Sequence, residues 1–67
     1  MIASLRGVVL SKDLESLVLE VGGVGHEVNV TSATASKLPA AGGETLLFIV
    51  ASFAMYGGGE TLYGFLT

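Results

Sequence analysis

His26 is the only histidine in the chain, and Glu27 and Glu20 are the carboxylates nearest to it that could help it bind a metal ion. Neighbouring residues of a strand point to opposite faces of the sheet, so His26 and Glu27 cannot readily bind the same ion. The chain has no cysteine, so no thiolate can complete such a site. We therefore predict no metal site, and we interpret His26 as a histidine at the edge of the core, since His is commonly of intermediate burial.

Nucleophilic catalysis has no better support in the sequence. The chain contains serines and one histidine, but no serine lies in the strained elbow that exposes a catalytic hydroxyl. We predict no catalytic residues, and we expect the chain not to be an enzyme.

Two glycine clusters resemble the start of phosphate-binding motifs. Gly23-Val24-Gly25 begins like a dinucleotide fingerprint, but the third glycine is missing and a strand, not a helix, is expected next. Gly57-Gly58-Gly59 lacks the lysine and the serine or threonine of a P-loop. Both clusters therefore predict chain reversals, and we expect no cofactor.

Five aromatic residues could stack on the bases of single-stranded nucleic acid, as some barrel proteins do. They are Phe48, Phe53, Tyr56, Tyr63 and Phe65. No cation is interleaved with them, so packing in the core or at an interface is the stronger interpretation. The chain has six acidic and three basic residues, for a net charge of −3. Since binding to nucleic acid depends on neutralising phosphates with Lys and Arg, this domain can supply little of that attraction.

Size and composition indicate one small domain that meets a partner. The chain has 67 residues, of which 51% are hydrophobic and 13% charged, which argues against disorder and against a fully solvated surface. The longest uncharged apolar run, Thr45 to Tyr56, is shorter than the roughly 18 residues that suggest a membrane span. The first residues lack the pattern of a secretory signal, so we expect a cytoplasmic protein.

The β pattern is clearest on either side of Val21-Gly22-Gly23-Val24. Leu17, Leu19 and Val21 alternate with more polar residues before the glycines, and Val24, His26, Val28 and Val30 do so after them. This period of two residues predicts a hairpin of two strands, each with one buried face. A slip of one residue would turn both apolar sets toward water, so the pattern also specifies the register.

The rest of the chain adds three strands and a helix. Ile2 to Leu10 is a strand in which Gly7 marks a bulge or a sharp bend, and residues 11–15 form a turn. Thr31 or Ser32 caps a helix of at most two turns, which Pro39 ends at Leu38, with Ala35 and Leu38 facing the sheet. Residues 45–56 and 60–66 are the last strands. This order predicts an all-β fold, a five-stranded Greek-key barrel of the oligonucleotide-binding (OB) type with one short helix between strands 3 and 4. An SH3-like barrel is the structural alternative.

The strand predicted over residues 45–56 is apolar on both faces, although a small barrel has only one interior. Either Leu46, Phe48 and Val50 or Leu47, Ile49 and Phe53 must therefore face outward. Because contiguous exposed apolar surface usually marks a partner site, we predict a subunit interface here. The candidate residues are Phe48, Ile49, Val50 and Phe53.

Several motifs of this chain occur together, in order, in one known family. They are Met1-Ile2, Leu5-Arg6-Gly7, Val21-Gly22-Gly23-Val24-Gly25 followed by Glu27-Val28, Leu38-Pro39, and Leu62-Tyr63-Gly64-Phe65. Over its whole length the chain resembles the N-terminal domain of the RuvA family, the Holliday-junction-binding subunits of the bacterial RuvAB branch-migration complex. The glycine hairpin and the closing Leu-Tyr-Gly-Phe are its most distinctive features.

The resemblance implies a non-catalytic scaffold domain that acts in DNA recombination, DNA repair and the SOS response to DNA damage. Such a domain helps to build a homotetramer on which a four-way junction lies. In the family, helix-hairpin-helix motifs downstream grip the DNA, and a last domain binds the RuvB ATPase. We expect residues 1–67 to be a single OB-type domain without those two. The alternative is an OB-like protein-interaction module that does not contact DNA.

The chain departs from the family at two positions or stretches. His26 stands where the family usually has tyrosine. The family also carries two carboxylates, the acidic pin at the junction centre, in the hairpin before the last strand. Those positions fall on Gly57 and Gly58 here, and only Glu60 nearby is acidic. The resemblance thus implies a junction-centre hairpin formed by Gly57, Gly58, Gly59 and Glu60 from which the pin is missing.

Overall fold

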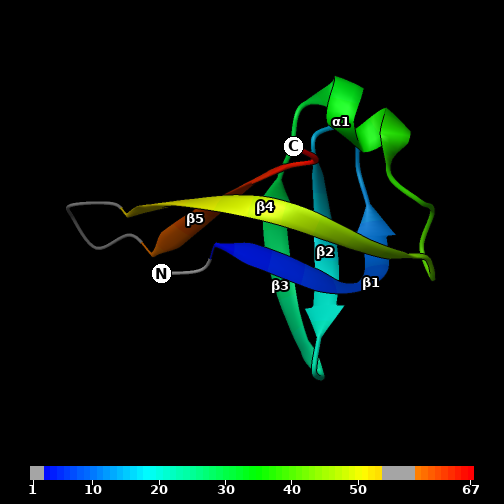
Figure 1. The fold of residues 1–67 in the computed structure, drawn as a ribbon, viewed down its shortest axis with the longest axis horizontal. Coiled ribbons are helices and arrows are strands. Elements are labelled where there is room, and N and C mark those ends of the chain that lie inside the picture. The colour runs from blue at the N-terminus through cyan, green and yellow to red at the C-terminus, as the bar shows by residue number, and fades with distance from the viewer. Residues whose placement is uncertain (1–2, 54–58) are drawn as a thin grey trace.

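In the computed structural model, which describes residues 3–53 and 59–67, five strands form a closed barrel and one short helix covers one of its ends (Figure 1). The elements are β1 (Ser4–Lys12), β2 (Ser16–Val21), β3 (Val24–Asn29), α1 (Ser32–Lys37), β4 (Glu44–Phe53) and β5 (Glu60–Phe65). Around the barrel the strand order is β1-β2-β3-β5-β4. This architecture confirms the predicted five-stranded OB-type barrel with its helix between strands 3 and 4.

The β2–β3 hairpin has the predicted register and turn. Val21 pairs with Val24, and the two glycines between them have positive φ angles of 59° at Gly22 and 88° at Gly23. A two-residue turn with both φ angles positive matches the twist of the flanking strands. Residues with side chains would be strained there, which explains the glycine pair.

Strand β1 belongs to two sides of the barrel. Its first half pairs with β4, its second half pairs with β2, and Val8 has a partner in both. A Cβ atom on Gly7 would lie 2.0 Å from the Glu20 carbonyl oxygen, so only glycine allows this approach of the backbones. The register shift lies beyond Gly7, between Val9 and Ser11, and β1 runs on to Lys12, two residues past the predicted end.

The core lies inside the barrel and consists of aliphatic side chains. Its most deeply buried members are Leu17, Leu19, Leu47, Val9 and Val28. Leu5 pairs with Leu47 across β1 and β4, so both point inward, and Ile49 follows with 6% of its side chain exposed. The register with β1 therefore places Leu46, Phe48 and Val50 on the outer face of β4.

Helix α1 has the predicted cap and end. The Thr34 backbone N–H donates to Thr31 Oγ1 at 3.1 Å, and Leu38 before Pro39 is extended, with φ −86° and ψ 153°. Ala35 and Leu38 are buried against the barrel, as predicted. No helix in the described ranges is long and apolar enough to cross a membrane.

A lysine from β1 holds the end of this helix. Lys12 Nζ donates to the carbonyl oxygens of Ala35 at 3.2 Å and Leu38 at 3.0 Å. The Ala35 carbonyl also accepts from the Leu38 N–H at 3.2 Å, and a cation at the helix C-terminus complements the helix dipole. One of the three cations of the chain is thus engaged by backbone carbonyls of the domain itself.

Candidate functional site

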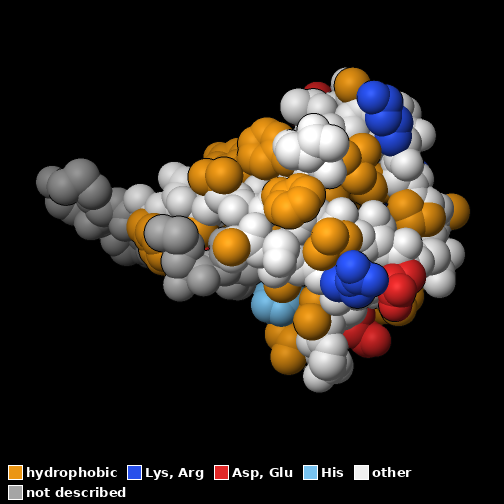
Figure 2. Space-filling view, viewed as in Figure 1, with side chains coloured by type: hydrophobic (Ala, Val, Ile, Leu, Met, Phe, Trp, Pro, Cys, Tyr) orange, Lys and Arg blue, Asp and Glu red, His pale blue; other side chains and the backbone are white. Residues whose placement is uncertain are grey.

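Four apolar side chains form a continuous patch on the outer side of β4 and β5. We call it the aromatic face, and its members are Phe48, Val50, Tyr63 and Phe65. Phe48 pairs with Phe65 and Val50 with Tyr63, so the four side chains stand next to one another. Between 42% and 58% of each is exposed. In Figure 2, hydrophobic side chains gather along the middle of the face on which β4 and β1 lie in front.

The residues predicted for a subunit interface do not all lie on this patch. Phe48 and Val50 do, whereas Ile49 points into the core. Phe53 shares the parity of Ile49, but it lies at the end of β4, opposite Glu60, and is 66% exposed. Of the four residues predicted for the interface, Phe48, Val50 and Phe53 are therefore exposed.

The predicted junction-centre hairpin lies only partly within the described residues. Gly57 and Gly58 fall outside them. Gly59 is exposed, and a Cβ atom on it would meet nothing within 4 Å. Glu60 begins β5 and is exposed. Its carboxylate is therefore accessible at the start of the strand.

Glu60 also borders a polar hollow of about 350 Å³ between β3 and β5. The hollow is lined by Gly25, His26, Glu27, Asn29, Glu60, Thr61 and Leu62. His26 is half-buried there and pairs with Leu19, so it lies at the edge of the core as predicted. Across the part of the chain that the structure describes, no group of three or more His, Cys, Asp or Glu side chains could hold a metal ion.

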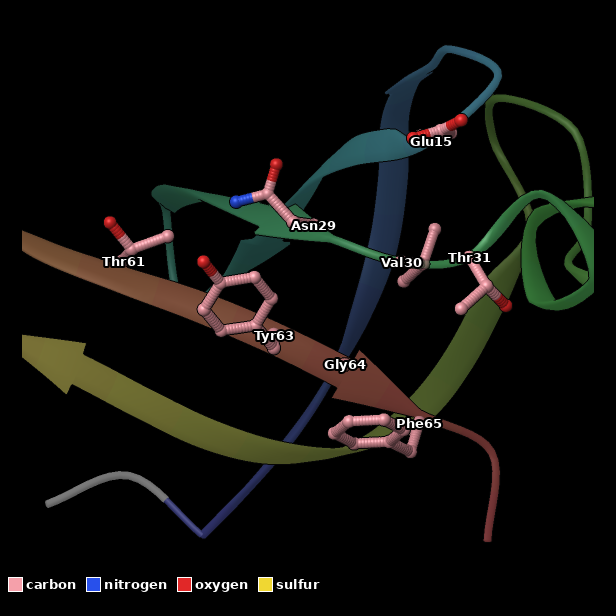
Figure 3. A pocket seen from close by; sticks show the side chains of 8 residues that line it. All are labelled: Glu15, Asn29, Val30, Thr31, Thr61, Tyr63, Gly64 and Phe65. Carbon is pink, nitrogen blue, oxygen red and sulfur yellow. The ribbon is translucent and has the colours of Figure 1, made fainter.

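A second, larger groove of about 580 Å³ lies on the other side of the contact between β3 and β5. It is lined by Glu15, Asn29, Val30, Thr31, Thr61, Tyr63, Gly64 and Phe65. Figure 3 shows Asn29 of β3 and Tyr63 of β5 facing each other at one end of it. Val30 and Gly64 are buried and form the apolar floor. Tyr63 and Phe65 also belong to the aromatic face, so the groove and the face share an edge.

The outer face of β2 and β3 has the opposite character. In OB-type proteins that bind oligonucleotides, strands 2 and 3 provide the binding surface. Here the outward cross-strand pairs are Ser16 with Asn29, Val18 with Glu27, and Glu20 with Gly25, so this face carries two carboxylates and no cation. Since phosphates are held mainly by Lys and Arg, this surface is poorly suited to nucleic acid.

Sequence reasoning missed two features of these surfaces. The sequence showed that residues 45–56 are apolar on both faces. It did not predict that Phe48 and Val50 pair with the aromatic residues of β5. The alternation of Leu62, Tyr63, Gly64 and Phe65 was the available signal, since two aromatics on one parity must share a face. It also missed the bonds of Lys12, for which a contact across 26 positions leaves no local signal.

The family model and the relatives in known proteins agree on one family. A family model described as the RuvA N terminal domain matches residues 1–64. The "Holliday junction branch migration complex subunit RuvA" of Dechloromonas aromatica (strain RCB) is 45% identical over 67 residues, which are 100% of this chain and 34% of that protein. The subunit of the same name from Myxococcus xanthus (strain DK1622) is 57% identical over 42 residues, or 63% of this chain and 21% of that protein. The one from Endomicrobium trichonymphae is 41% identical over 68 residues, covering 100% and 33% of the two chains. The chain spans between 21% and 34% of the length of these curated relatives.

Proposed function

The chain belongs to the RuvA N-terminal domain family, and on this basis we propose that it is a non-catalytic scaffold domain of a Holliday-junction-binding subunit. It acts in branch migration during homologous recombination and DNA repair, in the cytoplasm. The observation that carries this proposal is the family match over residues 1–64. The names of the relatives favour it over an OB-like protein-interaction module of another pathway.

The aromatic face supports the scaffold role. A monomeric domain rarely exposes paired aromatic and branched side chains on one continuous patch. In the proposed assembly, Phe48 and Val50 together with Tyr63 and Phe65 pack against a neighbouring copy within a homotetramer. Phe53, exposed on the opposite parity at the end of β4, would make a separate contact with the partner, whereas the buried Ile49 supports the aromatic face from the core.

The charge distribution supports a minor part in holding DNA. Lys12 is engaged at the end of α1, which leaves Arg6 and Lys37 as the remaining cations of the chain. Two separate cations cannot neutralise many phosphates. The grip on the four-way junction is therefore proposed to come from other parts of the subunit, and the resemblance to the family implies the same for the contact with the RuvB ATPase.

The hairpin between β4 and β5 is proposed to lie at the junction centre, formed by Gly57, Gly58, Gly59 and Glu60. Glycines at the two pin positions have no side chain with which to repel a phosphate. Only Glu60, exposed at the start of β5, offers a carboxylate near the crossover. Strand separation at this hairpin is therefore expected to depend little on electrostatic repulsion.

Domain exchange tests the proposed function directly. Residues 1–67 replace the matching segment of the Dechloromonas aromatica RuvA subunit, and the chimera is assayed with RuvB of that organism on a synthetic four-way junction. We expect the chimera to form tetramers by sedimentation and to support branch migration. A chimera that is folded and tetrameric but has no branch-migration activity would contradict the junction-scaffold role.

A matched variant tests the part played by the aromatic face. The chimera carrying Phe48→Lys should remain folded but lose tetramer formation, because the charge interrupts the aromatic face. The control is Ser52→Lys, which places the same charge on the same side of β4 outside the aromatic face. Equal assembly of the two variants would exclude the aromatic face as the interface.

A further inference from the structure

The barrel is closed between β3 and β5 by its shortest contact. We call this contact the seam, and it consists of the parallel pairs Val28 with Leu62 and Asn29 with Tyr63. The β2–β3 and β4–β5 ladders have six pairs each, and the β1–β4 ladder has five. Parallel pairing is also slightly less stable per residue than antiparallel pairing. The seam is therefore the weakest link around the barrel.

Additional hydrogen bonds reinforce the opposite side of the barrel more than the seam. The Val9 N–H donates to the Gly43 carbonyl at 2.8 Å, and the Gly42 N–H donates to the Val9 carbonyl at 2.7 Å. At the seam, the side-chain bond from Asn29 Nδ2 to the Leu62 carbonyl measures 3.3 Å, long for an N–H···O bond. Strand β1 is thus bonded along both edges, whereas β3 and β5 are joined by few hydrogen bonds.

Open space borders the seam on both sides. The polar hollow with His26 lies on one side and the groove with Phe65 lies on the other, and Asn29 and Thr61 line both. Figure 3 shows Asn29 of β3 and Thr61 and Tyr63 of β5 lining the groove beside the seam. Water can therefore reach both ends of the seam, and a ladder with solvent at its ends and few pairs opens at low free energy.

We propose that the seam is a built-in opening of the barrel, which separates before any other ladder and lets the β4–β5 hairpin swing as one arm on β1. The arm stays attached because the five pairs between β1 and β4 remain closed. Opening joins the two hollows into one slot and uncovers Val28 and Leu62, which are buried when the seam is closed.

The opening has a consequence for the proposed assembly. The arm includes Glu60, which belongs to the hairpin proposed for the junction centre, so the seam would set how freely Glu60 moves relative to β3. This consequence rests on the proposed function, whereas the opening itself does not. A test on the chain without DNA therefore separates the two.

Thiol labelling can measure the opening, because the chain has no cysteine of its own. The variant Val28→Cys places one thiol at the seam, and Val9→Cys places one in the β1–β2 ladder. Both valines are 0% exposed, so the two variants are matched in residue type and burial. Labelling with a disulfide reagent under native conditions, corrected for each variant's unfolding equilibrium in urea, reports local opening at each site.

We expect Val28→Cys to be labelled at least about tenfold faster than Val9→Cys after this correction, which corresponds to an opening about 1.4 kcal/mol less costly. Adding Asn29→Ala should accelerate labelling at position 28 severalfold and leave the corrected rate at position 9 unchanged. Equal corrected rates, or acceleration of both sites in the same proportion, would mean that only global unfolding exposes Val28 and would overturn the proposal.

Amide hydrogen exchange on the unmodified chain provides a second measurement if a cysteine variant does not fold. The amide protons that bond across the seam should exchange faster than those that bond between β1 and β2. Equal protection in the two ladders would refute the opening as well.

Discussion

The β2–β3 and β4–β5 hairpins are built alike and face different surroundings. Each has six antiparallel pairs, and a glycine-rich segment joins the strands of each. The outward pairs of the first include Val18 with Glu27, whereas those of the second include Phe48 with Phe65. The same backbone arrangement thus gives a polar outer face in one hairpin and an exposed apolar outer face, the proposed interface, in the other. The residue types at the outward-facing positions of each hairpin determine whether its outer face is polar or apolar.

The largest expected effect comes from two neighbouring residues of β4, one facing the core and one facing outward. Ile49→Lys would bury an unpaired charge in the barrel and should cost about 4 kcal/mol or more, enough to unfold a domain of this size. Phe48→Lys, one position away, should cost about 1 kcal/mol or less, because its side chain is half exposed. Urea denaturation followed by circular dichroism measures both.

The Phe48→Lys variant also tests whether the aromatic face drives association. The chain with Phe48→Lys should stay monomeric in a sedimentation series in which the unmodified chain associates. If the unmodified chain remains monomeric at high concentration, the aromatic face is not an interface by itself.

A second, smaller effect concerns the place where the two hairpins meet. A Cβ atom on Gly64 would lie 2.7 Å from Val28 Cγ1 and 3.2 Å from Leu47 Cδ1. Gly64→Ala should therefore destabilise the chain by about 2 kcal/mol through overpacking. The control is Gly59→Ala, where a Cβ atom meets nothing within 4 Å. Comparable urea midpoints for the two variants would show that β5 does not pack on β3 as described.

The third expected effect comes from reversing two charges on the outer face of the β2–β3 hairpin. The unmodified chain should bind four-way junction DNA weakly or not at all at physiological salt. With Glu20→Lys and Glu27→Lys together, we expect about tenfold tighter binding at low salt, to junction and duplex alike, because two added cations neutralise phosphates without reading shape. The control replaces both residues with Gln. Submicromolar binding of the unmodified chain in a gel shift would contradict the proposal that other parts of the subunit hold the DNA.

The smallest expected effect concerns the hairpin proposed for the junction centre. Gly57→Glu with Gly58→Asp, made in the full-length subunit, should change junction preference or branch-migration rate severalfold by restoring two repelling carboxylates. The neutral pair Gly57→Gln with Gly58→Asn controls for the side chains themselves. Unchanged rates and preference would show that this loop does not occupy the pin position.

Much of the fold could be predicted because its signals are local. The alternation around Leu19 and Val28, the glycine pair at the β2–β3 turn, and the Thr31 cap each act within a few residues, and the structure confirms all three. The last strand was predicted within one residue of its end.

The features that could not be predicted depend on contacts between distant parts of the chain. Residues 45–56 are apolar on both parities, so only the pairing of Leu47 with Leu5 shows which set faces inward. The need for glycine at position 7 comes from the Glu20 carbonyl, which no local pattern indicates. The aromatic face likewise exists only because the register brings Phe65 beside Phe48.

Closure of the barrel limits the form that association can take. A sheet with a free edge can add strands from other molecules without limit, whereas this closed sheet leaves backbone groups free mainly along β3 and β5 outside the two pairs of the seam. In the proposed assembly, copies of this domain meet mainly through side chains, and each aromatic face is unavailable to further copies once it is covered. The proposed assembly should therefore stop at a definite number of subunits and not grow into fibres.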